Sequence, residues 1–470
     1  MCPTRLSPLA IEVLPSERVD AASQAEQQAI FRVFLSTVQH YFGGFARLFQ
    51  SLTDPRDPTH IRYPLAALCC EGVLLFLCRL GSRRQLTHLL RDNAAVADKF
   101  QALFSVAGCA HGDTLNALCT GLDPAEMQTV LSGLSAQLIR QKVLYPYRLR
   151  GRYYVVGIDG TGTLSFSQRH CAHCLTRTVN GQTLYYHTVL EAKLLTPNGF
   201  AFSLMSEFIE NPDTNPAKQD CELKAFARLS ARLKKRFPRL PICLSLDALF
   251  ACGATLAACQ QYGWKYLIVL KPKDLPKVCA EFEALAPLAP GTHLQVHYGQ
   301  RAEIAQDFRW VNAISYVDSE RRAHTLAVIT CHETKHDAQG QPHTTHFQWI
   351  TNFKVKSQNV LDLATHGGRI RWKEENEGFN TQKHGGFALE HAFSQNYIAG
   401  QIFYFFLQIA HLLFQLMEQG SLFRQAFPKG VGSAKNIAFR LLEAWRNLRV
   451  SAQGLQQLLS ARFQIRFDSS

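Results

Sequence analysis

Acidic residues are scarce in this chain relative to basic ones. Its 470 residues include 37 Asp and Glu against 50 Lys and Arg, which leaves a formal net charge of +13. We therefore expect a polyanionic partner, and nucleic acid is the first candidate, because a protein that neutralises phosphates gains affinity through counterion release. A basic enzyme unrelated to nucleic acid stays open as an alternative, because net charge governs association and does not specify a fold.

Internal repeats, low-complexity tracts and a high density of charge are also lacking. Charged residues make up 19% and hydrophobic residues 47% of the sequence. This composition is typical of a globular protein and excludes a disordered chain, a coiled coil and a collagen-like repeat. A chain of this length is expected to form two or three domains.

The first twenty residues contain no apolar signal core, so we do not expect export. In a reducing compartment, most of the 14 cysteines should be small buried hydrophobic residues. The stretch 397–417 has no Asp, Glu, Lys or Arg and approaches membrane-spanning length. Gln401, Gln408 and Gln415 recur in it every seven residues and share one helix face. This spacing predicts a buried helix with a polar stripe and no membrane span.

Apolar periodicity predicts helices over most of 24–143, and strand-like segments follow. The order is YYVVGID, QTLYYHTVLEAKLL, GFAFSLMSEFI, a basic amphipathic helix over about 220–237, and PICLSLD. A ribonuclease H-like (RNase H-like) fold begins with this β-β-β-α-β order, with three meandering strands, a helix on one face, and a fourth strand beside the first. The strand-like segments that come next are too many for such a domain.

The expected fold class is therefore α/β, with a catalytic core that a β-rich insertion interrupts. The expected parts are a helical DNA-binding region (1–145), the first part of the RNase H-like domain (146–271), the insertion (272–350), the completion of the catalytic domain (351–392) and a helical C-terminal region (393–470).

Two aspartates close apolar strands: Asp159 ends VVGID and Asp247 ends PICLSLD. If the two strands are neighbours, both carboxylates emerge at the same edge of the sheet, where repulsion disfavours them unless divalent cations lie between them. Taken singly, each aspartate has an ordinary explanation, because an aspartate at a strand end commonly opens a turn.

A third acidic candidate, Glu375, lies in RIRWKEENEGFNTQKHGG. If this segment is one α-helix, a single stripe carries Arg371, Glu375, Gly378 and Gln382. Trp372 and Phe379 flank the stripe and are expected to pack on a sheet. An ordinary charged helix with an i, i+4 Arg–Glu pair explains the same residues.

Together these segments resemble the DDE transposases of bacterial insertion sequences, in particular the cut-and-paste group whose third acidic residue lies in a Y-R-E-K signature. The matching segments are GIDGTG around Asp159, KQDCE from Lys218 to Glu222, LSLDALF around Asp247, and RWKEENEGFNTQKHGGFALEH from Arg371 to His391. The resemblance spans roughly residues 150–395.

The resemblance implies a catalytic, metal-binding triad of Asp159, Asp247 and Glu375. It also implies a basic pair, Arg371 and Lys383, that is directed at the DNA end. The chain departs from the signature at two positions: the tyrosine would fall at Gly368, and the lysine at Gln382, one residue before Lys383. These departures leave the triad intact and concern the contacts with the terminal phosphate.

Such a triad implies two Mg²⁺ (or Mn²⁺) ions, held about 3.5–4 Å apart, that activate a water or a DNA 3′-hydroxyl and stabilise the leaving oxygen of an in-line displacement. The expected protein is a transposase that binds the terminal repeats of its element, cleaves double-stranded DNA there and joins the ends to target DNA. We expect it in the cytoplasm at the nucleoid, as a dimer in a synaptic complex. A catalytically inactive or domesticated transposase-derived DNA-binding protein is the alternative, and a structure-selective nuclease without strand transfer is a third.

Further basic residues are candidates for contacts with the DNA backbone. They are Lys218, Lys224 and Arg228 at the predicted helix 220–237, and Arg148, Arg150 and Arg152 in the connector that precedes the first strand. We assign DNA recognition to this connector together with the helical region 1–145. The ordinary explanation is that the helix residues form a basic face exposed to solvent and that the connector arginines solvate a linker.

Cys171 and Cys174 have the spacing of half a zinc knuckle. No second C-x-x-C occurs in the sequence, so His187 or Cys221 would have to complete a structural Zn²⁺ site. A redox-active cysteine pair and ordinary hairpin residues are the alternatives.

Overall fold

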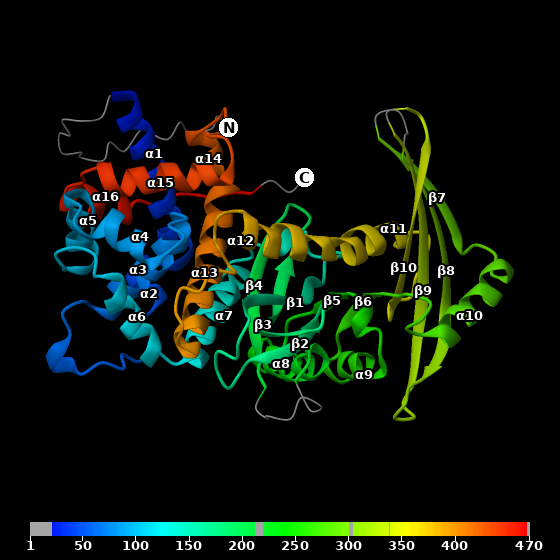
Figure 1. Ribbon diagram of the computed structural model, residues 1–470. Helices are drawn as coiled ribbons and strands as arrows, with labels where there is room; N and C mark the ends of the chain where they lie inside the picture. The colour runs from blue at the N-terminus through cyan, green and yellow to red at the C-terminus, as the bar shows by residue number, and fades with distance from the viewer. Residues whose placement is uncertain (1–20, 212–219, 300–303, 338, 468–470) are drawn as a thin grey trace. The chain divides into compact units, whose positions relative to one another are not determined.

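The computed structural model describes residues 21–211, 220–299, 304–337 and 339–467. It divides into two compact units (Figure 1). Unit 1 consists of Met1–Lys142 and Phe379–Ser470, and unit 2 of Val143–Gly378. The helical regions that we predicted at the two ends of the chain thus belong to one unit, and unit 2 is the α/β part.

Unit 1 is helical in its described residues. Its helices are α1 (Ala21–Phe42), α2 (Phe45–Leu48), η1 (Pro58–His60), α3 (Leu65–Leu77), α4 (Arg83–Leu86), η2 (Thr87–Arg91), α5 (Ala94–Phe104), α6 (Gly112–Gly121), α7 (Pro124–Arg140), α12 (Thr381–His384), α13 (Tyr397–Glu418), α14 (Ser421–Ala426), α15 (Ala434–Asn447) and α16 (Ala452–Ser460).

Helix α13 is buried along most of its length. It is long and apolar enough to cross a membrane, yet 83% of its apolar window is buried inside the protein. The polar stripe is internal as well: Gln382 Nε2 donates a hydrogen bond to Gln408 Oε1 (2.9 Å), and Gln415 Nε2 lies 2.7 Å from His411 Nε2. Because these polar groups bond to one another, they can be buried at little cost. The helix is therefore a core helix, as the spacing of its glutamines predicts.

Helix α3 carries a carboxyl group into the interior of unit 1. Glu71 is 0% exposed, and its Oε1 accepts a hydrogen bond from the backbone N–H of Ala110 (2.8 Å). Its Oε2 has no hydrogen-bond partner among the residues that the structure describes. Burial raises the pKa of Glu71 to about 8, because the ionised form is poorly solvated there.

We expect Glu71 to make the protein less stable as the pH rises. The side chain titrates near 4.5 in the unfolded chain and near 8 in the folded one, so stability that is fully present below pH 4.5 is lost as the pH approaches 8. Glu71→Gln keeps the shape and the acceptor for Ala110 but cannot ionise. It should remove on the order of 5 kcal/mol of this pH dependence. Denaturant unfolding at several pH values measures the effect, and equal slopes in the two proteins would contradict it.

Unit 2 is built on one ten-stranded mixed sheet. Its strands are β1 (Tyr154–Phe166), β2 (Leu175–Val179), β3 (Gln182–Leu195), β4 (Ala201–Ile209), β5 (Ile242–Leu246), β6 (Lys265–Val269), β7 (His293–Tyr298), β8 (Ile304–Val317), β9 (Ala323–His336) and β10 (Pro342–Thr351). The order is β2-β3-β1-β5-β6-β10-β9-β8-β7, and β4 also pairs with β3. Strands β1, β5 and β6 are mutually parallel, whereas β3 is antiparallel to β1.

The predicted β-β-β-α-β order corresponds to β1, β3, β4, the helix α8 (Glu222–Arg236) and β5. Strand β2 was not predicted. Strands β7 to β10 form the predicted β-rich insertion, but they continue the same sheet, because β10 pairs antiparallel with β6. Between the strands lie η3 (Tyr145–Tyr147), η5 (Ala248–Phe250), α9 (Gly253–Tyr262), α10 (Pro276–Leu285) and η6 (Ala286–Leu288).

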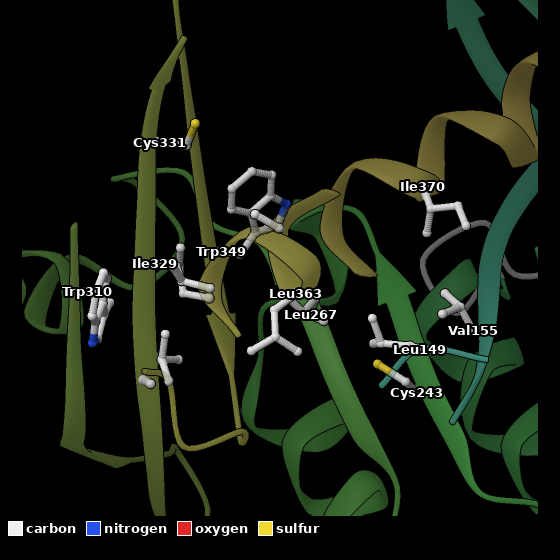
Figure 2. Packing of buried hydrophobic residues seen from close by; sticks show 14 of the residues in the cluster. Leu149, Val155, Cys243, Leu267, Trp310, Ile329, Cys331, Trp349, Leu363 and Ile370 are labelled. Atoms are coloured by element: carbon white, nitrogen blue, oxygen red, sulfur yellow. The ribbon is translucent and has the colours of Figure 1, made fainter. Parts of the chain in front are cut away.

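Different helical segments cover the two faces of the sheet around β1. Helix α8 packs on one face through its apolar side, and the chain after β10 packs on the other through α11 (Val360–Asp362), η7 (Leu363–Gly368), η8 (Arg369–Arg371) and η9 (Glu374–Asn380). Figure 2 shows the resulting core on the second face, where Val155, Leu267 and Ile370 belong to one buried cluster. Because strand residues alternate between faces, Gly157 and Asp159 lie on the same face as Val155.

The segment that we predicted as one α-helix is instead a succession of tighter and wider turns. A 3-10 turn (η8) is followed by a π-helix (η9) and then by the short α12. A π-helix closes its hydrogen bonds over five residues instead of four, so side chains leave the stripe that α-helical spacing predicts. Phe379 is buried at 1% exposure, but Trp372 is 55% exposed. The prediction that Trp372 packs on the sheet was therefore wrong.

Candidate active site

Strand pairing brings Asp159 and Asp247 to the same level of the sheet. Strands β1 and β5 are parallel neighbours, and Gly157 pairs with Ser245. Two residues further along each strand come Asp159 and Asp247, so their side chains leave the sheet on the same face. The sequence predicts that both aspartates end their strands. Asp247 does follow the end of β5, but β1 continues past Asp159 to Phe166, so Asp159 lies within its strand and pairs with Glu191 of β3.

Each aspartate also has a local structural partner. Asp247 caps η5, because its Oδ1 accepts a hydrogen bond from the backbone N–H of Leu249 (3.0 Å). Asp159 Oδ1 accepts one from the N–H of Gly160 (2.9 Å), and its Oδ2 lies 3.5 Å from Nη1 of Arg371. Asp247 therefore has the ordinary turn-opening role. The capping hydrogen bond uses only one of its two carboxylate oxygens.

Glu375 joins this pair through the segment that packs on the same face. Burial raises the pKa of Asp159 to about 6; Arg371 opposes the shift, and the negative charges of Asp247 and Glu375 add to it. Charges that act on one another in this way lie near one another. The structure thus brings Asp159, Asp247 and Arg371 together where β1 passes the end of β5, and Glu375 makes the smallest of the named contributions to the pKa of Asp159. Glu375 itself is exposed.

A fourth carboxyl group, that of Glu222, approaches from the opposite face. It opens helix α8, and its pKa is raised by burial first and then by the charges of Asp159 and Asp247. A Cβ atom at Gly160 would lie 2.2 Å from Glu222 Oε1, so glycine is what lets this carboxyl reach the strand. Glu222 was not among the predicted site residues, although it ends the KQDCE segment. Two features of the sequence could have indicated it: Glu222 is an acidic residue at the start of a predicted helix, and Gly160, next to Asp159, leaves room for a side chain to approach the strand.

A fifth carboxyl group lies buried beside the site. Glu374 is 0% exposed, and neither of its oxygens has a hydrogen-bond partner among the described residues. Its pKa is raised well above the usual range by burial and then by Asp159, while the buried Lys193 opposes the shift. A Cβ atom at Gly157 would lie 2.2 Å from Glu374 Oε2. Glu374 is thus a buried, packed neighbour of the exposed Glu375.

A hollow of about 530 Å³ adjoins the Glu222 side of the strand. Gly160, Gly162 and Thr188 line it together with Arg177, Tyr186 and Glu222. It presents one basic side chain and several polar ones beside two acidic groups, Asp220 and Glu222.

The predicted DNA-binding residues differ in whether acidic side chains of the protein already pair with them. Arg371 faces Asp159, whereas Arg228 forms ion pairs with Glu207 and Asp220 (both 2.6 Å). Lys224 is exposed on α8. Lys383 belongs to unit 1, where its Nζ lies 3.2 Å from Glu390. Lys218 lies outside the described residues.

The connector arginines lie on an exposed turn of unit 2. The guanidinium of Arg148 covers the ring of Tyr145 (3.3 Å to its centre), and that of Arg152 lies 5.3 Å from the centre of the Tyr153 ring. Arg150 forms a 3.4 Å ion pair with Asp362. Pairs of this kind are weak at an exposed surface, so they leave the arginines able to meet phosphates.

The cysteine pair lies in the turn that leads into β2. Cys171 and Cys174 are close to His187 of β3, and the donor atoms of the three residues all lie within 4.8 Å of one another. Of the two residues that the sequence offered as a third ligand, His187 is in this cluster. Cys221 is exposed and is not part of it.

No family model matches the chain, and no curated protein matches it.

Proposed function

We propose that the protein is a transposase of a bacterial insertion sequence, which binds the ends of its element and catalyses metal-dependent cleavage and strand transfer. The observation that carries the proposal is the pair of carboxylates on two adjacent parallel strands: Asp159 within β1 and Asp247 just after β5 each come two residues beyond the paired Gly157 and Ser245. Glu375 acts electrostatically on Asp159 from a segment that packs on the same face. These are the three acidic residues that the resemblance assigns to catalysis.

The order of the central strands also supports the proposal. Strands β4, β3, β1, β5 and β6 are consecutive neighbours in the sheet, with the first three antiparallel and the last two parallel to β1. This order agrees with the one that we expect for an RNase H-like core, in which three meandering strands are followed by a helix and by a strand that returns beside the first.

The donor set fits Mg²⁺. Carboxylate oxygens are the ligands that this hard cation prefers, and it takes few of them from the protein. Asp159, Asp247 and Glu375 would hold the ions, with Glu222 near enough to add a fourth carboxylate. When bound, a pair of such ions supplies a nucleophile at neutral pH and stabilises the leaving oxygen.

The protein's own residues prepare this site in three ways. Arg371 lies beside Asp159 and keeps that carboxyl more acidic than burial alone would allow. The capping bond from Leu249 fixes the side chain of Asp247. The arginines and lysines around the site would align the DNA backbone, because phosphate contacts fix register and orientation.

The test is to recover the DNA that the protein selects and to ask whether it is cut. Full-length protein is incubated with fragmented genomic DNA of its source organism, and the bound fragments are sequenced. The recovered fragment is then incubated with the protein and Mg²⁺, with EDTA as the control. We expect enrichment of one repeated end sequence, Mg²⁺-dependent cleavage at its border, and joining to a plasmid target.

Each other outcome points to a different function. Selective binding without cleavage would identify a transposase-derived DNA-binding protein. Cleavage that depends on DNA structure and ignores sequence, with no joining, would identify a nuclease.

A further inference from the structure

The turn after β1 and the middle of β3 form a compact group of metal-binding atoms. Cys171 Sγ lies 3.7 Å from Cys174 Sγ and 3.1 Å from His187 Nε2, and Cys174 Sγ lies 3.3 Å from the same nitrogen. Cys174 is 1% and His187 9% exposed, whereas Cys171 is half-buried. Soft sulfur and imidazole ligands in one place suit Zn²⁺.

The sulfur–sulfur distance matches a tetrahedral zinc site, and the sulfur–nitrogen distances of 3.1 and 3.3 Å are somewhat shorter than such a site requires. Two thiolates that are each about 2.3 Å from a tetrahedral Zn²⁺ lie about 3.8 Å apart, and a thiolate and an imidazole nitrogen lie about 3.5 Å apart. The observed sulfur–sulfur distance of 3.7 Å agrees with the first value. It is far longer than the roughly 2.05 Å of a disulfide, so the two thiols are not bonded to each other.

The local sequence explains how the cluster forms. A C-x-x-C turn places both sulfurs on one side of a tight loop. The pairing of β1 with β3 then brings His187 opposite Leu164, shortly before that loop. His170 lies next to the group, with its ring centre 6.5 Å from that of His187.

We propose that Cys171, Cys174 and His187 bind one Zn²⁺ ion, with a water molecule or His170 in the fourth position. The ion fixes the loop between β1 and β2 against β3. It thereby shapes the adjacent hollow, because Leu175 and Tyr186, which neighbour Cys174 and His187 in the sequence, pair across β2 and β3 and line its wall. This site is separate from the carboxylate cluster and does not depend on the proposed function.

Metal analysis of the full chain tests the proposal. Protein purified without chelator, stripped, reloaded with Zn²⁺ and desalted should retain about one zinc per chain. Cys174→Ser and His187→Gln should each reduce the retained zinc to below about a tenth of that value, whereas Cys221→Ser, which changes an exposed cysteine outside the cluster, should retain all of it. Co²⁺ in place of Zn²⁺ should give thiolate charge-transfer absorption that Cys174→Ser abolishes.

A measurement on the unmodified chain covers the case in which a variant fails to fold. Zn²⁺ should slow the alkylation of Cys171 at least tenfold, since a metal-bound thiolate is a poorer nucleophile, and should leave the alkylation rate of Cys221 unchanged. Wild-type protein that retains no zinc after desalting, or alkylation of Cys171 that is equally fast with and without Zn²⁺, would overturn the proposal. Rapid formation of a Cys171–Cys174 disulfide in the presence of Zn²⁺ would also overturn it, in favour of a redox pair.

Discussion

Replacing Asp247 by Asn should abolish DNA cleavage while leaving DNA binding unchanged or stronger. Under the proposed function the change removes a ligand of the metal ions and a negative charge near the DNA phosphate, so the rate should fall by roughly a thousandfold or more. The fold should survive, because asparagine caps a helix about as well as aspartate and can still accept the hydrogen bond from Leu249. Cleavage of a labelled element end and binding of the same DNA, measured side by side, separate the two effects.

Glu375 and Glu374 offer a matched pair of controls on consecutive residues. Glu375→Gln should reduce cleavage as strongly as Asp247→Asn, because Glu375 is exposed and contributes to the raised pKa of Asp159. Glu374→Gln should cleave within about tenfold of the unmodified chain, because Glu374 is fully buried and burial raises its pKa. The reverse result would make Glu374 the third acid, and full activity in all three variants would rule out this carboxylate cluster as the site of cleavage.

Neutralising Arg148, Arg150 and Arg152 together should weaken binding to every DNA sequence. Each arginine that neutralises a phosphate contributes about 0.9 to the slope of log affinity against log salt, so the triple glutamine variant should flatten that slope by up to about three. The loss should fall short of this limit, because Arg150 already has a carboxylate partner in Asp362. Fluorescence anisotropy over a salt series, with the element end and an unrelated duplex, measures it.

Arg322 provides the control for this experiment. Its guanidinium is held by Asp318 (2.7 Å) and Glu320 (2.8 Å) at the turn between β8 and β9, so Arg322→Gln should leave the salt slope unchanged. An unchanged slope in the triple variant as well would mean that the connector is only a solvated linker, and DNA recognition would then have to lie elsewhere in the chain.

The order of the strands and the position of the two aspartates could be predicted because both depend on simple periodicity. Apolar runs such as VVGID and PICLSLD mark buried strands. Strand β5 stops before Asp247 as predicted, whereas β1 continues past Asp159 to Phe166 because it stays paired with β3. The pairing of β1 with β5 then places Asp159 next to Asp247. The buried helix α13 was predictable for a similar reason, since its glutamines repeat at a helical spacing.

The parts that were missed depend on packing between distant residues. The π-helix η9 departs from regular spacing, so the environment of Trp372 could not be read from an α-helical pattern. Glu222 lies far from Asp159 in the sequence, and only the packing of α8 opposite Gly160 shows that it approaches. Strand β2 is short and largely exposed, so it lacks the apolar alternation that marks a strand.

The pairing of β10 with β6 has a consequence for solubility. Without the insertion, β6 would be the last strand of the core, and its residues Tyr266, Leu267 and Ile268 are almost fully buried. An apolar strand with unpaired backbone groups is a template for aggregation. The insertion moves the free edge to β7, a strand of six residues that is mostly exposed and carries His293 and His297. Strands β7 to β10 thus cover an aggregation-prone edge, and we expect a chain that lacks them to aggregate.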